Sequence, residues 1–379
     1  MKKTLKITLL MAVIASFGFT GCSDNDDSSC TLTTWYEDAD GDGLGNPDSS
    51  LEACDQPDGY VSDNTDADDT EGTGDGSDST YTGTASVTQG LAETTTANLF
   101  PGGVRDAGLG TIEATDGATW TVPAQVNFTD DGFPFASDLH NTYGNTYSSA
   151  EEAVNALDGS DIVEIDSDGE VITAYIFADN YFEMYVNGVA VGKDAVPFTE
   201  FNSSIVRFKV TAPYTIAMKL VDWEENLGLG SENNQGNAYY AGDGGMVAVF
   251  KDESGEIVAI TGSDWKAQTF YTAPIKDLSC PTENGATRGT DDCDEAASNN
   301  GTSYYGLHWA IDANWEAEGF DDSEWPNATT YTNETIVVNN KPSYTNFTDV
   351  FDDPENDAEF IWSTNVVLDN LVLVRYTIQ

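Results

Sequence analysis

The residues best suited to chemistry in this sequence are three aspartates that alternate along the backbone. They are Asp38, Asp40 and Asp42, with Gly41 between the last two and Gly43 after them. The alternation lets three carboxylates converge on one hard cation while the glycines permit a tight turn, and Ca²⁺ is the ion that such a cage suits. A solvated acidic loop is the alternative. Because so short a segment has almost no apolar core, we expect the calcium to be structural.

The loop is not an EF-hand. An EF-hand needs a bidentate Glu at the twelfth position, which is Ser49 when counted from Asp38. Residues 30–69 instead resemble the thrombospondin type 3 related calcium repeat of bacterial surface proteins. The resemblance rests on an aromatic pair, an aspartate ladder, a cysteine, a Pro-x-Gly-Tyr-Val turn and a closing acidic cluster, here Trp35-Tyr36, Asp38 to Gly43, Cys54, Pro57 to Val61 and Asn64 to Asp69. It implies further calcium ligands in the closing cluster, namely Asp66, Asp68 and Asp69.

The cysteines depart from that repeat in one respect. Its closing cluster usually carries a cysteine, but this chain has Ala67 there. Cys54 therefore needs another partner, and Cys30 is the only nearby cysteine that is not expected to be lipidated. Because an exported protein meets an oxidising compartment, we expect a Cys30–Cys54 disulfide. Without Cys22, which is expected to be lipidated, the chain has an even number of cysteines. Export and this even number also predict a disulfide between the two remaining cysteines, Cys280 and Cys293.

The first residues predict export. Residues 1–21 begin with lysines, continue through the apolar run Ile7 to Phe19 and end in small residues, which is a signal peptide too short to span a bilayer. The junction Phe19-Thr20-Gly21-Cys22 resembles a bacterial lipoprotein box, which implies that Cys22 is lipidated and becomes the mature N-terminus. An ordinary signal peptide cut elsewhere is the alternative.

An acidic tether follows the expected anchor. Residues 22–29 contain the run Ser23-Asp24-Asn25-Asp26-Asp27. Acidic residues beside a lipidated cysteine resemble the surface-export signal of Bacteroidetes lipoproteins, which implies an outer-membrane lipoprotein exposed on the cell surface. A merely flexible, solvated tether would have the same composition.

The charge balance limits the partners. Lys and Arg total 14 against 66 Asp and Glu, so the formal net charge is −52. Such a charge repels nucleic acid and anionic membrane surfaces and favours divalent cations as partners. Nucleic-acid binding is therefore excluded as a function class. With only two histidines in the chain, a zinc site or a histidine base is also disfavoured.

The rest of the chain divides into a linker and a body. Residues 70–86 are dominated by Gly, Ser, Thr and Asp, which predicts a flexible, disordered linker. Residues 87–379 show short apolar alternations separated by turn signals, which predicts an all-β fold, an antiparallel β-sandwich. Its central stretch, Asp168 to Gly192, is expected to form a β-hairpin that turns at Asp179-Asn180, and the chain is expected to turn again at Asn187-Gly188. A helix is expected at Ser148 to Leu157, where Ser148 or Ser149 can cap.

Strands are expected near residues 118–128, 171–177, 182–191, 205–210, 214–222, 246–250, 257–261, 334–339, 359–362 and 371–378. Within this body, three motifs together resemble the galactose-binding-like jelly roll that accompanies glycoside hydrolases: Tyr185-Val186-Asn187-Gly188, Gly262 to Lys266, and Trp315 with Phe320 to Trp325. The resemblance covers about Asp168 to Ala328. It implies a jelly roll, often with carbohydrate-binding ability, and brings no catalytic residue with it.

Aromatic side chains carry the functional signal of the body. Sugar rings present apolar faces that lie on exposed phenol and indole rings, while neighbouring amides and carboxylates bind the hydroxyls. The candidate ligand-binding residues are Tyr239 and Tyr240, in the long segment Glu224 to Gly245, and His308 and Trp309. Core packing is the alternative for each ring.

No catalytic motif is present. His140 and His308 are the only imidazoles, the sequence has no Gly-x-Ser-x-Gly nucleophile elbow, and no carboxylate pair is marked out among 66 acids. We therefore expect a lipid-anchored cell-surface binding protein, with an extracellular glycan or another surface ligand as its partner, rather than an enzyme. The alternatives are an adhesion or matrix protein that recognises a protein or cell surface, and a glycan-active hydrolase with unidentified carboxylates.

Overall fold

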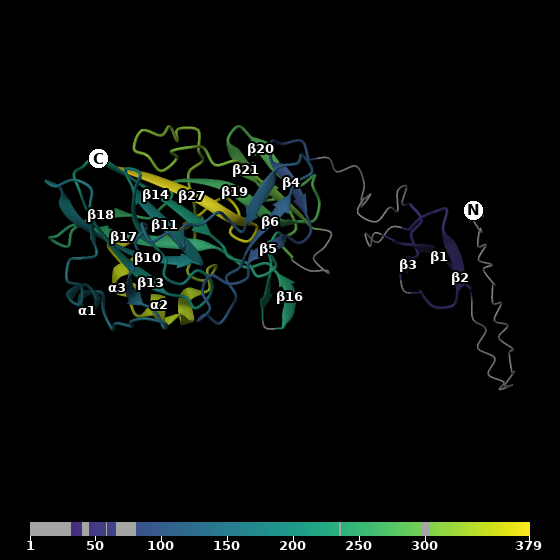
Figure 1. Cartoon of the computed structure of the whole chain (residues 1–379), viewed down its shortest axis with the longest axis horizontal. Coiled ribbons are helices and arrows are strands. Elements are labelled where there is room, and N and C mark those ends of the chain that lie inside the picture. The colour runs from purple at the N-terminus through teal and green to yellow at the C-terminus, as the bar shows by residue number, and fades with distance from the viewer. Residues whose placement is uncertain (1–31, 40–44, 58, 66–80, 235, 297–303) are drawn as a thin grey trace, which may run out of the picture. The chain divides into compact units, whose positions relative to one another are not determined.

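The computed structural model describes residues 32–39, 45–57, 59–65, 81–234, 236–296 and 304–379 (Figure 1). The chain divides into two compact units, Met1–Asp75 and Gly76–Gln379. Several predicted features lie outside the described residues: the signal peptide, the acidic tether, Cys22, Cys30, Asp40, Asp42, Asp66, Asp68 and Asp69. Within the described ranges, no helix is long and apolar enough to cross a membrane.

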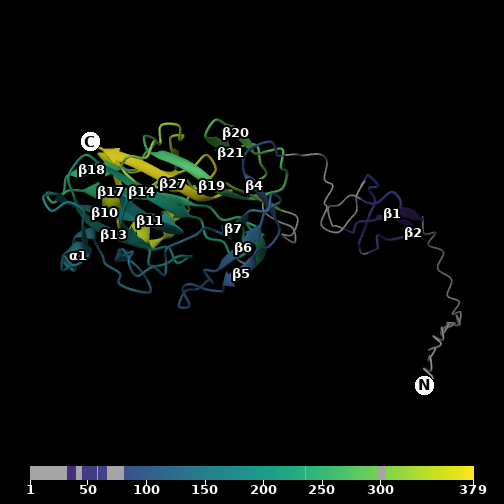
Figure 2. The same cartoon turned by 45° about the horizontal axis from the view of Figure 1, so that its top comes forward.

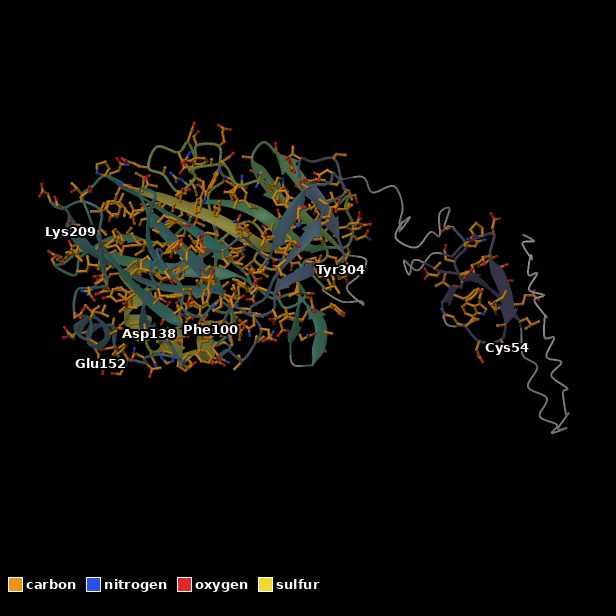
Figure 3. The ribbon with its side chains drawn as sticks, viewed as in Figure 1. Cys54, Phe100, Asp138, Glu152, Lys209 and Tyr304 are labelled. Atoms are coloured by element: carbon orange, nitrogen blue, oxygen red, sulfur yellow. A yellow bond between two sulfur atoms is a disulfide. The ribbon has the colours of Figure 1, made fainter. Side chains whose placement is uncertain are left out.

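The first unit contains a three-stranded antiparallel sheet in the order β2-β1-β3, with β1 at Thr33–Glu37, β2 at Ser50–Ala53 and β3 at Tyr60–Val61. The Trp35 indole donates to the carbonyl of Ala53 at 3.3 Å. Among the described residues of this unit, only Gly45 is buried. The sheet therefore has almost no apolar core of its own, as its length predicts. Cys54, labelled in Figure 3, is disulfide-bonded, and its predicted partner lies outside the described residues.

The second unit is built on two mostly antiparallel sheets (Figures 1 and 2). Sheet I has the order β23-β26-β17-β10-β13-β8, and β18 and β9 pair with β17 and β13. Its strands are β8 Ser137–His140, β9 Ile162–Glu164, β10 Glu170–Asp179, β13 Ser203–Val210, β17 Gly245–Lys251, β18 Ile257–Ile260, β23 Thr329–Tyr331 and β26 Phe360–Trp362.

Sheet II has the order β12-β11-β14-β27-β19-β22-β4. Its strands are β4 Ser86–Gln89, β11 Tyr181–Val186, β12 Val189–Lys193, β14 Tyr214–Val221, β19 Lys266–Ile275, β22 Tyr305–His308 and β27 Asp369–Ile378. A small sheet of β5 Glu93–Thr96, β6 Leu109–Glu113 and β7 Thr119–Val122 lies at one end of this unit (Figure 2).

The remaining elements are short. Three two-stranded pairs are β15 Glu232–Asn234 with β16 Asn237–Tyr240, β20 Thr282–Asn284 with β21 Thr287–Gly289, and β24 Asp352–Asp353 with β25 Asn356–Asp357. The helices are α1 Ala150–Asn155, η1 Val338–Asn340, α2 Pro342–Thr345 and α3 Thr348–Phe351. Strands therefore dominate the described chain, and the predicted all-β sandwich is confirmed at that level.

Side chains of β14 show how the two sheets are buried. Met218 and Leu220 belong to the apolar cluster that the two sheets enclose, whereas Ala217 and Val221 belong to a second cluster on the opposite face of sheet II. Successive side chains of a strand point to opposite faces. Because both faces of β14 are covered, all of its residues are buried and its sequence is one continuous apolar run with few polar residues.

The predicted hairpin at Asp179-Asn180 is wrong. β10 ends at Asp179 and pairs with β13 and β17 in sheet I, whereas β11 begins at Tyr181 and pairs with β12 and β14 in sheet II. The chain therefore crosses from one sheet to the other at this point, and alternation alone cannot distinguish a crossing from a hairpin. The next turn was predicted correctly, because Asn187 and Gly188 both have positive φ and join β11 to β12.

Other local predictions have mixed outcomes. The predicted helix is confirmed as α1, and the Ser149 side chain caps it by accepting from the Glu152 amide at 3.2 Å. The strand predicted at 334–339 is wrong, since η1 occupies its last part. The Cys280–Cys293 disulfide is confirmed.

Two stretches were assigned incorrectly or missed. The ten residues of β19 were missed because buried polar residues interrupt its apolar pattern; Thr269 and Thr272 donate to the Asp369 carboxylate at 2.8 and 2.6 Å. Residues 81–86, assigned to the linker, are held on the body, because Tyr81 and Thr84 donate to the Glu283 carboxylate.

Candidate functional site

The segment 223–244 joins β14 to β17. The part of it that lies next to the sheets, which we call its root, is buried. Trp223 is fully buried and donates through its indole nitrogen to the Gly108 carbonyl at 3.1 Å. Leu229 is also fully buried. Gly230 has φ +56, and a Cβ atom added to it would lie only 2.2 Å from the Ala273 carbonyl oxygen. Only glycine fits there. The segment is therefore anchored at its root rather than being a loose connection.

The outer part of this segment is the hairpin β15–β16, which projects from the body in Figure 1. Tyr240 at its end is 47% exposed, Tyr239 is partly exposed with φ 58, and Asn237 is exposed. The two tyrosines predicted to bind a ligand are therefore solvent-accessible and lie beside an amide side chain.

Arg105 connects this hairpin to the loop that precedes β6. In the register of the hairpin, Tyr240 lies opposite Glu232, so the two side chains share a face. The Glu232 carboxylate accepts from the Arg105 guanidinium. Next to Arg105, the amide of Val104 donates to the Tyr143 hydroxyl at 3.0 Å. Hydrogen bonds thus lead from Glu232, which lies opposite Tyr240 in the hairpin, through Arg105 and Val104 to Tyr143.

Tyr143 begins a row of rings that the sequence did not reveal. The Phe100 ring lies 5.1 Å from the Tyr143 ring and 6.5 Å from the Phe128 ring, and the Phe128 ring lies 5.3 Å from that of Phe135. We refer to these four residues as the aromatic row. Tyr143 and Phe135 are 38% and 52% exposed, so both ends reach solvent. The turn-rich stretch 129–147, dense in Asn, Asp, Gly and rings, was the signal that could have pointed here.

Amide and carboxylate groups accompany the aromatic row. Asp138 accepts from the side chain of Asn141 at 2.8 Å and from the backbone and side-chain nitrogens of Asn145 at 2.8 and 3.0 Å. Phe100 and Asp138 are labelled on the same side of the body in Figure 3. This side therefore offers exposed rings together with polar groups that hydrogen-bond.

The predicted ring platforms His308 and Trp309 are instead buried. His308 is stacked between Tyr271 and Trp120, with ring centroids 4.4 and 5.2 Å away, and its Nε2 lies 2.9 Å from the Thr88 hydroxyl. Burial lowers the pKa of His308 to about 3, so the imidazole is neutral. The Trp309 indole donates to Glu283 at 2.9 Å. Both rings have structural partners and present no exposed face, which corrects the prediction.

A cluster of four carboxyl groups, three on buried residues and one on a partly buried residue, lies at the root of the 223–244 segment. We define the acid cluster as Asp179, Asp222, Glu224 and Asp243. Burial, followed by the charge of neighbouring acids, raises the pKa of Asp179, Asp222 and Glu224 well above the ordinary values, and burial raises that of Asp243 to about 6. No local pattern points to this cluster, because it combines residues from three separate parts of a chain with 66 acids.

The strand register brings these acids together. Asp179 ends β10 opposite Gly245, the first residue of β17, so it lies beside the residues that precede β17. Asp222 follows β14, and its amide donates to the Asn370 carbonyl at 2.9 Å. The Gly242 amide donates to Glu224 Oε1 at 3.1 Å. A Cβ atom added to Gly242 would lie 3.6 Å from Asp222 Oδ1. Gly242 thus lets the backbone approach two carboxylates at once.

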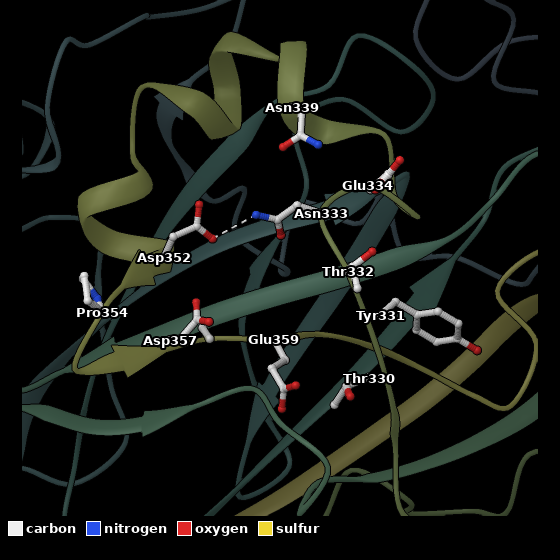
Figure 4. A pocket seen from close by; sticks show the side chains of 11 residues that line it. Thr330, Tyr331, Thr332, Asn333, Glu334, Asn339, Asp352, Pro354, Asp357 and Glu359 are labelled. Atoms are coloured by element: carbon white, nitrogen blue, oxygen red, sulfur yellow. Dashed lines mark hydrogen bonds between the residues drawn. The ribbon is translucent and has the colours of Figure 1, made fainter.

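A separate polar pocket of about 630 Å³ lies between β23 and the β24–β25 pair (Figure 4). Asp352 accepts there from the Asn333 amide at 3.1 Å and from the Tyr344 hydroxyl. Asp357 lies opposite Asp352 in the strand register, and burial together with that neighbour raises its pKa. The lining is acidic and its one ring, Tyr331, is only partly exposed, so it suits sugar stacking less well than the aromatic row.

Of the predicted calcium ligands, only Asp38 lies among the described residues, where its amide donates to the Gly59 carbonyl at 2.9 Å. Within the ranges that the structure describes, no three His, Cys, Asp or Glu side chains form a ready-made metal site. In comparisons with known proteins, no family model matches the chain, nor does any curated protein or solved structure.

Proposed function

We propose that this protein is an exported, lipid-anchored surface protein whose larger unit binds a neutral carbohydrate. The proposed binding face consists of hairpin β15–β16 and the aromatic row. The observation that carries this proposal is the set of exposed rings Tyr240, Tyr143 and Phe135. The strand that bears Tyr240 is linked to the aromatic row through its partner Glu232, which accepts from Arg105, and through the hydrogen bond from Val104 to Tyr143. Exposed rings of this kind stack on the apolar faces of sugars.

Charge supports a neutral ligand. A net charge of −52 repels acidic polysaccharides, whereas the amides of Asn237 and Asn145 bind hydroxyl groups without any charge on the ligand. The two-sheet sandwich supports the finer proposal of a galactose-binding-like jelly roll, which often binds carbohydrate. Fold alone does not imply function, so the proposal rests on the binding face.

The first unit completes the proposal. We assign it as the calcium-stiffened repeat of a surface lipoprotein anchored through Cys22. Its support is a small sheet that buries only Gly45 among its described residues, because a unit with so little core needs another source of stability. Calcium bound by Asp38, Asp40 and Asp42 would supply that stability.

Glycan-array screening of the mature chain, followed by calorimetry with the best ligand, tests the binding face. Replacing both Tyr239 and Tyr240 with Ala is expected to weaken binding by about 1 to 3 kcal/mol, or roughly 5- to 150-fold, with little change in melting temperature. Tyr143→Ala tests the aromatic row in the same way. Val189→Ala is the matched control, because it shortens an exposed apolar side chain on β12.

The other outcomes assign the alternatives. Unchanged glycan affinity in both tyrosine variants contradicts the proposed face. Attachment to proteins or cells without any glycan signal favours an adhesion protein. Release of reducing sugar that Asp357→Asn abolishes would favour a hydrolase using the pocket of Figure 4, where Asp352 and Asp357 lie opposite one another.

A further inference from the structure

We propose that the acid cluster binds one Ca²⁺ ion, which fastens the root of the 223–244 segment to the two sheets. This site is separate from the N-terminal repeat, and the inference does not depend on whether the protein binds a glycan. It would give the larger unit a calcium requirement of its own.

Unpartnered buried oxygens are the first support. Asp222 and Glu224 are only 3% and 2% exposed, yet Asp222 Oδ2 and Glu224 Oε2 have no hydrogen-bond partner within the described protein, and Asp243 Oδ2 also has none. Leaving a buried polar group unsatisfied costs about 1 to 3 kcal/mol, and more when the group is charged. A cation among these oxygens would remove that cost.

The protein's own cations do not neutralise the cluster. The ion pairs in the described part of the chain include none of its four members. The nearby Arg105 pairs with Glu232 and lies 3.8 Å from Glu225. Lys341 acts on Asp179 and Asp243 through its charge, but its ammonium lies 3.9 Å from the centre of the Phe201 ring. No ion pair among the described residues therefore neutralises these carboxyl groups when they lose their protons.

The ligand chemistry favours Ca²⁺. Carboxylate oxygens are hard ligands. Asn370 is bonded to this site through its backbone carbonyl, which accepts from the Asp222 amide, and its buried side-chain Oδ1, which has no partner, is a candidate neutral ligand. Ca²⁺ accepts six to eight oxygens in flexible arrangements, whereas Mg²⁺ demands a near-ideal octahedron.

The carboxylates must move on binding, because the described side chains form no ready-made metal site. Mutual repulsion keeps like charges apart until a cation lies between them. Asp222 and Glu224 already approach the same point beside Gly242, so Asp243 or Asp179 needs to turn toward them. Such adjustment is compatible with Ca²⁺ and much less so with Mg²⁺.

The ion would join separate parts of the fold. Asp179 ends β10 of sheet I, Asp222 and Glu224 follow β14 of sheet II, and Asp243 precedes β17. A cation that these residues share would tie both ends of the 223–244 segment to both sheets. Hairpin β15–β16 lies in the middle of that segment, so its root would be fixed by the ion.

The test is a calcium titration of the full mature chain carrying Asp38→Asn, Asp40→Asn and Asp42→Asn, which removes the proposed ladder of the repeat. Calorimetry after chelation should give one bound Ca²⁺ in this background and none after Asp222→Asn with Glu224→Gln. The calcium-induced rise in melting temperature should also be absent from the Asp222→Asn, Glu224→Gln variant. Asp357→Asn with Glu359→Gln, in the pocket of Figure 4, is the matched control and should keep both signals.

Folding of the double variant is checked in chelator. It should melt no lower than its parent, because two repelling buried charges have been removed. Unchanged stoichiometry and unchanged calcium stabilisation in the Asp222→Asn, Glu224→Gln variant overturn the proposal. So does the absence of any calcium effect in the parent, or an equal stabilisation by Mg²⁺.

Discussion

Glu183 and the acid cluster are both buried in the larger unit, but their surroundings differ. Glu183 is fully buried and accepts from the hydroxyls of Tyr181 and Tyr185 at 3.2 Å each and from the Asn127 side chain at 2.9 Å. Its counterion is Lys219, at 3.1 Å. In the acid cluster, by contrast, carboxylates face one another and leave oxygens without partners.

The contrast separates a structural carboxylate from a binding one. Burying a charge is costly unless hydrogen bonds and a counterion compensate, and the environment of Glu183 supplies both. The acid cluster has neither in full, so its carboxyl groups must hold protons or share a cation. Their raised pKa values and unsatisfied oxygens have the same cause, which is the lack of sufficient hydrogen bonds and of a counterion.

The largest expected effect is on the pH dependence of stability. A carboxyl group with a raised folded-state pKa stabilises the fold below its unfolded pKa, about 4, and this contribution is lost as pH rises through the folded pKa. That value is about 6 for Asp243, and the pKa values of the other three members are also raised. In chelator, the free energy of unfolding should therefore fall from pH 4 to pH 7.

Each pKa unit corresponds to about 1.4 kcal/mol, and several groups act together. Calcium should flatten this curve, because it binds the deprotonated carboxylates. Urea unfolding followed by tryptophan fluorescence, with and without calcium, measures the difference. Two other buried groups also titrate: the pKa of Asp194 is raised to about 7, and His308 stabilises the fold in its neutral form, above its lowered pKa. Both contribute equally to the curves with and without calcium. Parallel curves would contradict the prediction.

Glu183→Gln should give the next largest effect. It leaves Lys219 buried without its counterion, and breaking a buried pair from one side costs about 3 to 5 kcal/mol. Because the Glu183 site is already satisfied, the loss should be the same with calcium and with chelator. Urea unfolding in both conditions checks this. A calcium-dependent loss would show that the two sites are not distinct.

Removing the Cys280–Cys293 disulfide should have a somewhat smaller effect. Its sequence separation of 13 residues corresponds to about 3 kcal/mol of chain entropy. The loop it closes carries Glu283, another satisfied carboxylate, which accepts from Tyr81, Thr84 and Trp309. The paired serine variant should thus lose stability without losing calcium binding. Calorimetric melting with a calcium titration measures both, and loss of the ion would contradict the separation.

Some features could be predicted from sequence because they depend on neighbouring residues. The Ser149 cap, the Asn187-Gly188 turn and the apolar run of β14 are such features. The crossing at Asp179-Asn180 was missed because alternation reports burial but not strand partners. β19 was missed because its buried threonines bond to Asp369, a distant residue.

The candidate site was predictable only in part. Tyr239 and Tyr240 were found as an unusually polar, ring-bearing segment, and the structure places them on an accessible hairpin. Burial of His308 and Trp309 depends on tertiary neighbours, which no local sequence pattern reports. The acid cluster depends on where β10, β14 and β17 meet, which no local pattern records.

Anomalous diffraction from crystals of the full mature chain soaked in a terbium salt would show whether the acid cluster holds an ion, since Tb³⁺ replaces Ca²⁺ among oxygen ligands. A peak is expected beside Gly242, at about 2.3 to 2.6 Å from carboxylate oxygens of Asp222 and Glu224, and none beside Glu183. The proposed ion of the N-terminal repeat serves as the positive control. A map with a peak at the repeat and none at the acid cluster would show that the cluster binds no calcium.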